Sequence, residues 1–251
     1  MEGPENHFKV TIVGCGDAFA SGGRFNTCFY LDFGNVHFLV DCGASSLVAM
    51  KQHAVPVSKI SFILLSHLHG DHFGGIPFFL LDAKNIQKRT EALTIMGPKG
   101  TAQKTKELTA LLYPGTDFDA LGFNVDFQEY ESRQKVEIEQ LEIEAFSVIH
   151  SAESQPHGLR ITRNDKVFAY SGDTEWTESL FDISRNADLF ICESNYYNPV
   201  GPNHLDYRTL VANRGRFTYK RILLNHLGGE MLSRISDLEL ECAYDGQEIT
   251  F

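Results

Sequence analysis

The stretch SHLHGDH at residues 66–72 decides how this chain folds. It places three imidazoles and one carboxylate close together, directly after the apolar run ISFILL at residues 60–65. Imidazole and carboxylate groups are the ligands that divalent zinc, iron or manganese prefer in proteins. A hydrophobic core has no use for His-x-His-x-Asp-His, so the stretch predicts a metal site at the end of a strand.

The spacing of these side chains suits two ions. In a loop with alternating side-chain directions, His67 and His69 can reach one ion while Asp71 and His72, half a turn further on, reach a second. Two ions about 3.5–4 Å apart can bridge a water molecule, lower its pKa and bind both the attacking and the leaving oxygen. Because two ions need more ligands than these four residues supply, we expect further ligands elsewhere in the chain.

Three further candidates each follow a strand-like apolar run, where an α/β scaffold presents its active-site loops. They are His150 after residues 141–149, Asp173 after residues 166–170, and His226 after residues 221–225. Taken singly, each could only cap a turn. Together with the first stretch, they indicate one metal centre.

In this order the seven residues resemble the metallo-β-lactamase superfamily of binuclear hydrolases, from Val10 to Gly246. The resemblance implies an α/β protein with a four-layer αββα sandwich, and coarse patterning of strand runs and helices agrees with it. It also implies the ligand sets: His67, His69 and His150 on one ion, Asp71, His72 and His226 on the second, and the Asp173 carboxylate bridging both. Asp41 matches the family's aspartate that steadies the metal loop through hydrogen bonds.

Within the superfamily, residues 64–77 and 97–101 resemble the tRNase Z and phosphodiesterase branch. Glu193 followed by His204 resembles that branch's glutamate and histidine pair, in which the histidine, oriented by the carboxylate, protonates the leaving oxygen or steadies the phosphate. A neutral imidazole held by a carboxylate suits general acid catalysis near pH 7. The alternative for His204, which lies among Pro and Gly residues, is an exposed loop histidine with no role.

Two features differ from tRNA-processing enzymes of this branch. Many of those enzymes carry a long basic, glycine-rich arm, whereas residues 101–115 here predict only a short helix with few lysines. The chain has 22 basic and 33 acidic residues, a net charge of −11, which opposes binding to a phosphate backbone. Both features favour a small-molecule or short phosphodiester substrate and do not favour a long nucleic acid as partner.

Composition predicts one domain over residues 1–251. No stretch approaches the roughly 18 apolar residues of a membrane span, so no membrane partner is expected. Residues 1–6 lack the basic and apolar regions of a signal peptide. The five scattered cysteines form no Cys-x-x-Cys pair, which suits reduced thiols and predicts a cytoplasmic protein. The resemblance also allows for a homodimer.

The predicted layout places strands near 8–13, 27–33, 36–40, 60–65, 122–129, 135–148, 157–162, 166–170, 188–192 and 221–224, and helices near 45–52, after Gly75, after Gly100, and near 175–182 and 205–213. Together these features predict a hydrolase that uses two divalent metal ions, zinc with manganese or iron as alternatives. The leading hypothesis is a phosphodiesterase that uses a metal-bridging hydroxide, with Asp71, Glu193 and His204 as its catalytic residues.

Other activities use the same machinery. A carboxyl-, thio- or sulfate-ester hydrolase is the first alternative, and a tRNA 3′-processing endonuclease and an iron-dependent oxidoreductase are others. A non-catalytic module that has kept the fold is disfavoured, because all seven ligand positions are filled.

Overall fold

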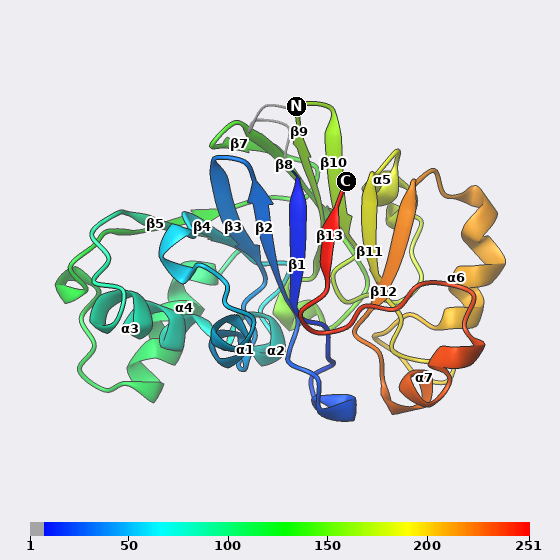
Figure 1. Cartoon of the computed structure of the whole chain (residues 1–251), viewed down its shortest axis with the longest axis horizontal. Coiled ribbons are helices and arrows are strands. Elements are labelled where there is room, and N and C mark those ends of the chain that lie inside the picture. Colours follow the sequence, from blue (N-terminus) through cyan, green and yellow to red (C-terminus); the bar gives the residue numbers. More distant parts are fainter. Residues whose placement is uncertain (1–7) are drawn as a thin grey trace. The chain divides into compact units, whose positions relative to one another are not determined.

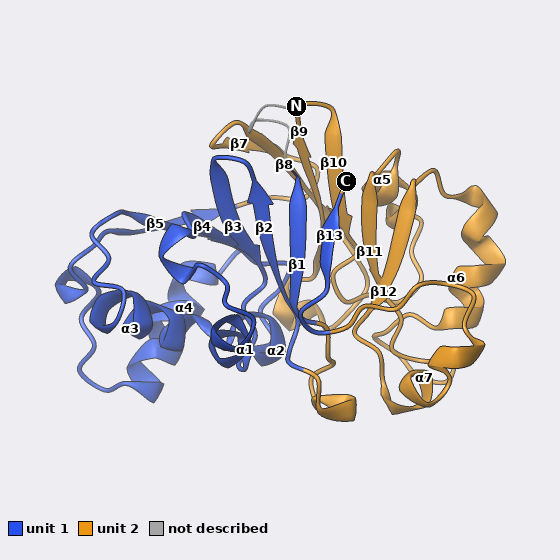
Figure 2. Cartoon of the chain, in the orientation of Figure 1, with its two compact units in different colours: residues 1–14, 25–129, 245–250 blue, residues 15–24, 130–244, 251 orange. Residues whose placement is uncertain are grey.

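Apolar runs separated by short turns build two mixed β-sheets, each with its own helices (Figure 1). The computed structural model describes residues 8–251. The described chain divides into two compact units (Figure 2): unit 1 holds residues 8–14, 25–129 and 245–250, and unit 2 holds residues 15–24, 130–244 and 251.

The sheet of unit 1 has seven strands in the order β13-β1-β2-β3-β4-β5-β6. The strands are β1 (Lys9–Gly14), β2 (Cys28–Phe33), β3 (Val36–Val40), β4 (Phe62–Leu64), β5 (Leu93–Gly97), β6 (Val125–Glu129) and β13 (Glu248–Thr250). Pairing is antiparallel from β13 to β3 and parallel from β3 to β6. The helices of this unit are α1 (Ser46–Gln52), α2 (Gly70–Phe73), α3 (Ile76–Asn85) and α4 (Thr101–Leu112), with short 3-10 turns at Val57–Lys59 and Phe118–Ala120.

Burial of alternate strand residues against α1 and α3 forms the core of unit 1. Met50 of α1 and Phe79 and Leu80 of α3 are buried in one cluster with Ile63 of β4 and Ile95 of β5. Burying side chains of this size contributes about 1.5–3 kcal/mol each. This packing fixes the carboxyl ends of β3 and β4, where the loops with the predicted metal ligands begin.

The sheet of unit 2 has six strands in the order β12-β11-β10-β9-β8-β7. They are β7 (Lys135–Ile138), β8 (Leu141–Ser147), β9 (His157–Arg163), β10 (Lys166–Tyr170), β11 (Leu189–Glu193) and β12 (Arg221–Asn225). Pairing is antiparallel from β7 to β10 and parallel from β10 to β12. Its helices are α5 (Ser179–Ser184), α6 (Tyr207–Asn213) and α7 (Gly229–Ser233), with 3-10 turns at Ser21–Gly23, Ala152–Ser154, Arg214–Arg216 and Ile235–Asp237.

The α/β class predicted from the sequence is confirmed by these two mixed sheets. One expected strand, residues 135–148, is instead the hairpin β7–β8, because Glu139 and Gln140 turn the chain with φ of 48° and 67°. The expectation for residues 1–6 lies outside the described residues, and the single domain over 1–251 stays a prediction. Within residues 8–251, no helix has the length and apolar character needed to cross a membrane.

Candidate metal centre

The predicted ligands of unit 1 lie on the loop after β4 and on α2. His67 and His72 are buried, and their ring centroids lie 4.0 Å apart. His69 lies beside His67, with 4.9 Å between ring centroids. The carbonyl oxygen of His69 accepts hydrogen bonds from the amides of His72 and Phe73, so the helix that carries Asp71 and His72 begins directly after His69. The loop and α2 therefore bring His67 beside His69 and His72, and His72 beside Asp71.

Asp41 holds this loop from β3. Its fully buried carboxylate accepts hydrogen bonds of 2.7 Å from the Ser66 amide, the Ser66 hydroxyl and Nδ1 of His72. Burial raises the pKa of Asp41, while His72 and Ser66 oppose the rise. Because Nδ1 of a neutral His72 donates to Asp41, its lone pair lies on Nε2, the form in which imidazole binds a metal. Ser66 Oγ also lies 3.0 Å from Nδ1 of His67.

Two glycines allow the loops after β3 and β4 to pack main chain against main chain. The Cys42 amide donates to the His72 carbonyl oxygen at 2.6 Å, and the Gly75 amide donates to Cys42 at 2.8 Å. A Cβ atom on Gly43 would overlap the main-chain oxygen of Asp71, and one on Gly75 would overlap that of Gly43. The close approach therefore requires glycine at both positions.

In unit 2 the predicted residues lie at the carboxyl ends of the parallel strands. Asp173 follows β10, Glu193 ends β11 and His226 follows β12. All three are buried, and Nε2 of His226 lies 3.2 Å from Oδ2 of Asp173. Parallel strands present their loops at one edge of the sheet, which explains why residues 20 to 53 positions apart meet.

Glu193 and His204 form the predicted pair. Nδ1 of His204 lies 3.1 Å from Oε2 of Glu193, whose side chain is fully buried, whereas the His204 side chain is 20% exposed. Glu193 also accepts a hydrogen bond from the Thr174 amide. Burial raises the pKa of Glu193 well above its usual range, and the negative charge of the nearby Asp173 carboxylate is the second largest cause of the rise. His204 stacks on His226, with 5.2 Å between ring centroids.

His150 lies on the loop after β8 and is held by a main-chain atom. Its Nδ1 lies 2.6 Å from the carbonyl oxygen of Asn203, and its ring centroid lies 4.9 Å from that of His204. A carbonyl oxygen can only accept, so Nδ1 carries the proton. The lone pair of the neutral ring is therefore on Nε2.

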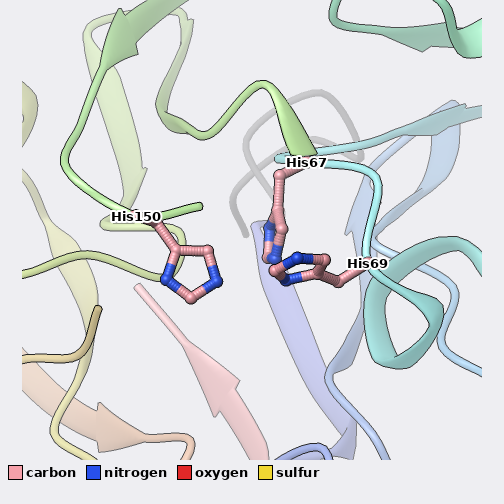
Figure 3. A group of neighbouring side chains, drawn as sticks. All are labelled: His67, His69 and His150. Atoms are coloured by element: carbon pink, nitrogen blue, oxygen red, sulfur yellow. The ribbon is translucent and has the colours of Figure 1, made fainter. Parts of the chain in front are cut away.

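All seven predicted ligands fall into two groups whose ligand atoms lie within 4.8 Å of one another. One group is His67, His69 and His150 (Figure 3); the other is Asp71, His72, Asp173 and His226. His204 gathers in the same way with His150 and Asp173, and with Glu193 and His226.

The donor chemistry fits divalent metal ions. Nε2 of His72 lies 3.2 Å from Oδ2 of Asp71, although Nδ1 of the same ring is engaged by Asp41. A nitrogen lone pair and a carboxylate oxygen repel each other at this distance, and a cation bound by both atoms removes the repulsion. Three imidazoles in one group and a mixed set of carboxylates and imidazoles in the other are ligand sets that zinc accepts.

Some contributors to the site were not predicted. Ser66, the first residue of the stretch 66–72, has a detectable signal, because a hydroxyl beside ligands often orients them. Asn195 donates from Nδ2 to the carbonyl oxygen of His226 at 3.0 Å, and Asn203 acts through its main-chain oxygen. The Asn203 contact carries no sequence signal, because a main-chain oxygen can accept whatever the residue type. The Asn195 contact carries none either, because its acceptor is a main-chain oxygen 31 positions away.

Comparison with known proteins identifies the family of the chain. The profile of the Anti-Pycsar protein Apyc1 family matches residues 8–241. Ribonuclease Z of Clostridium acetobutylicum is 30% identical over 241 residues, covering 74% of this chain and 75% of that protein. Two other ribonuclease Z relatives are matched over 63% and 60% of their own length.

Two solved structures share the fold. The metallo-β-lactamase fold protein YhfI from Bacillus subtilis has a TM-score of 0.77 at 23% identity, with 98% of this chain and 100% of that chain covered. The short form of human tRNase Z has a TM-score of 0.79 at 20% identity, with 96% and 98% covered. With its metallo-β-lactamase fold and ribonuclease Z relatives, this chain belongs to the family of the Anti-Pycsar protein Apyc1.

Proposed function

We propose that this protein is a binuclear metal-dependent hydrolase of ester bonds, and specifically a phosphodiesterase. The observation that carries the proposal is the gathering of all seven ligand side chains into two groups. His67, His69 and His150 would hold one divalent ion; Asp71, His72 and His226 would hold the second; and Asp173 would bridge them. Zinc suits these ligands, with manganese or iron as alternatives.

When bound, two such ions supply positive charge at the phosphoryl oxygens and make bound water more acidic. The residues of the chain supply orientation. Asp41 and Ser66 hold His72 and His67 by Nδ1. The Asn203 carbonyl oxygen holds His150 in the same way. Each of these three rings therefore turns Nε2 toward the site, which is the arrangement that metal-ligating imidazoles commonly have.

His204 is the proposed general acid. Glu193 engages Nδ1 of His204, so in the imidazolium form, with a proton on each ring nitrogen, Nε2–H is the donor that would pass its proton to the leaving oxygen and leave the neutral ring. The partial exposure of His204 allows a substrate to reach it, whereas Glu193 is fully buried and acts through the imidazole. Asp71 is the third proposed catalytic residue, and it would act by binding the second metal ion.

The substrate we propose is a small-molecule or short phosphodiester. Ribonuclease Z relatives support phosphodiester chemistry, because a ribonuclease cleaves phosphodiester bonds. The net charge of −11 favours a short substrate over a long nucleic acid. Those same relatives make tRNA 3′-processing the second candidate. A cytoplasmic location and a homodimer complete the proposal; fractionation and light scattering would measure them.

The test is hydrolysis of a chromogenic bis-aryl phosphodiester by protein reconstituted separately with zinc and manganese. We expect metal-dependent turnover that Asp71→Ala abolishes, while Asp126→Ala, an exposed carboxylate of β6, leaves it unchanged. Dinucleotides, precursor tRNA and aryl carboxyl, thio- and sulfate esters are then compared by kcat/KM. No phosphodiester turnover with two ions bound would contradict the proposal and favour the other esters.

Replacement of His204 tests the role of the general acid. With a substrate whose leaving group is poor, His204→Gln is expected to lower kcat about 100- to 10,000-fold, because the proton would no longer be supplied. With a good aryl leaving group, which needs no proton, the loss should be much smaller. Equal losses on both substrates would argue that His204 acts by another route.

A further inference from the structure

Glu175 lies two residues after Asp173, in the turn between β10 and α5, and its carboxylate reaches a loop far along the chain. Oε1 of Glu175 accepts a hydrogen bond of 2.8 Å from the main-chain amide of Asn203. We propose that Glu175 is a positioning residue that fixes the orientation and the tautomer of the His150 imidazole. The inference rests on the proposed function only for the role of His150 as a metal ligand.

Asn203 connects Glu175 to His150. The same residue whose amide is held by Glu175 accepts the proton of His150 Nδ1 on its carbonyl oxygen at 2.6 Å. Only the two soft dihedrals of Asn203, φ and ψ, separate its amide from its carbonyl group. A hydrogen bond that fixes the amide therefore restricts the direction of the carbonyl oxygen. Displacement of Asn203 would therefore release Nδ1 of His150.

The loop that carries Asn203 has little regular structure of its own. Residues 198–203 contain no helix or strand, and the Asn203 side chain is exposed. Asn203 has a φ of 70°, in the left-handed region that Asn tolerates better than most residues but that the chain does not favour. A hydrogen bond from a half-buried carboxylate to a main-chain amide is stronger than one between neutral groups, and it can hold such a conformation.

Glu175 also contacts the segment that carries the His150 imidazole. Its amide donates to the carbonyl oxygen of Ile149, the residue before His150, at 2.7 Å. The Ile149 amide in turn lies 3.1 Å from the hydroxyl of Thr174. One turn, Thr174–Glu175, is thereby bonded to the segment that carries the imidazole and to the segment that carries its acceptor.

The test uses metal-free protein labelled with ¹⁵N-histidine, in which long-range ¹H–¹⁵N spectra report the tautomer of each ring. A His150→Gln variant assigns the resonances. In the wild type we expect His150 with its proton on Nδ1. In Glu175→Ala we expect a mixture that includes the Nε2–H form, which free imidazole side chains prefer, and Glu175→Gln should restore the wild-type pattern because its amide oxygen can still accept.

The matched control is Glu129→Ala. Glu129 Oε1 accepts from the Gly100 amide at 2.9 Å, so this variant removes the same kind of carboxylate-to-amide bond from a different loop. It should leave the His150 resonances unchanged. If Glu175→Ala does not fold, Glu175→Asp carries the same prediction, because its shorter side chain cannot reach Asn203. Unchanged His150 resonances in a folded Glu175→Ala or Glu175→Asp protein would overturn the inference.

A zinc titration separates this inference from the proposed function. Glu129→Ala should bind two zinc ions with the same two affinities as the wild type. Glu175→Ala should bind one of the two ions about tenfold more weakly than the wild type does. If the wild type takes up no zinc, the proposed function fails, while the spectra still decide the role of Glu175. Equal zinc affinities in wild type and Glu175→Ala would count against the positioning role.

Discussion

At the scale of single residues, Asp41 combines full burial with three hydrogen bonds and an unusual backbone conformation. Its φ is 58°, where Asn and Asp are tolerated and Ala is strained. Asp41→Ala should lower the free energy of unfolding of the metal-free protein by about 1–3 kcal/mol, because the Ser66 amide and Nδ1 of His72 lose their acceptor. Urea denaturation measures the loss.

The matched variant is Asp41→Asn, which suits the same φ and keeps one acceptor oxygen. It should lose less stability than Asp41→Ala but still weaken zinc binding, because an amide cannot replace all the carboxylate contacts of Ser66 and His72. Equal stability of wild type and Asp41→Ala would show that the buried carboxylate does not hold the loop.

His157, the first residue of β9, makes the free energy of unfolding depend on pH. The burial of its side chain determines the sign of that dependence. Burial lowers the pKa of His157 below its ordinary value near 6.5, despite a hydrogen bond between Nδ1 and the Gln155 carbonyl oxygen. The unfolded chain therefore takes up the proton first. The free energy of unfolding should fall as the pH drops from about 6.5 through the folded-state pKa. His157→Gln should reduce this slope in urea titrations; an unchanged slope would assign the acid sensitivity to other groups.

The residues that could be predicted from the sequence are those whose side-chain chemistry is itself the signal. His67, His69, Asp71 and His72 are recognisable because their spacing has no structural use. Asn203 and Glu175 are not recognisable, since one acts by its carbonyl oxygen and the other by a bond to an amide 28 positions away. Such contacts depend on the three-dimensional path of the main chain.

At the scale of elements, the site depends on how closely two strand-end loops approach. Gly43→Ala should place a methyl group against the main-chain oxygen of Asp71, so the α2 segment must move. We expect a loss of about 1–3 kcal/mol in unfolding free energy, typical of overpacking, together with weaker zinc binding.

Gly70→Ala is the control for this change. Gly70 begins α2, and a Cβ atom there would have no atom within 4 Å. It should be neutral or slightly stabilising, because Ala favours a helix. If both variants lost similar amounts of unfolding free energy, the cause would be that this segment tolerates no added side chain. The close main-chain approach at Gly43 would then not be the cause.

The predicted elements hold where apolar runs are long and bounded by turn residues, as in β2, β3, β9 and β10. The hairpin β7–β8 cannot be predicted from the sequence, because its turn, Glu139-Gln140, has positive φ at two residues that seldom adopt it. The expected helix near 175–182 begins only at Ser179, because Thr174 and Glu175 bond to the Ile149 segment instead. Three-residue β13 is too short for a periodic pattern.

At the scale of the whole molecule, bound metal should stabilise the fold. An ion that binds only the folded chain adds about 2.7 kcal/mol per site at one hundred times its Kd, and for a chain of this size each kcal/mol raises Tm by about 2–4 °C. Zinc should therefore raise Tm in scanning calorimetry, and a chelator should reverse the rise. Asp126→Ala should show the same rise and Asp173→Ala a smaller one; an equal rise in both would contradict Asp173 as a ligand.

The outer strand of the unit 1 sheet has a consequence for biosynthesis. β13 pairs with β1, yet the ribosome makes it only after residues 130–244, which belong to unit 2. Until then β1, with the sequence KVTIVG and five buried residues in the folded protein, is the open edge of its sheet. Open edges invite pairing with other chains, and early segments fold while later ones are still being translated. The nascent chain therefore exposes the edge of β1 until residues 248–250 pair with it, and the three-residue β13 that then forms the outer edge offers other chains fewer free main-chain groups.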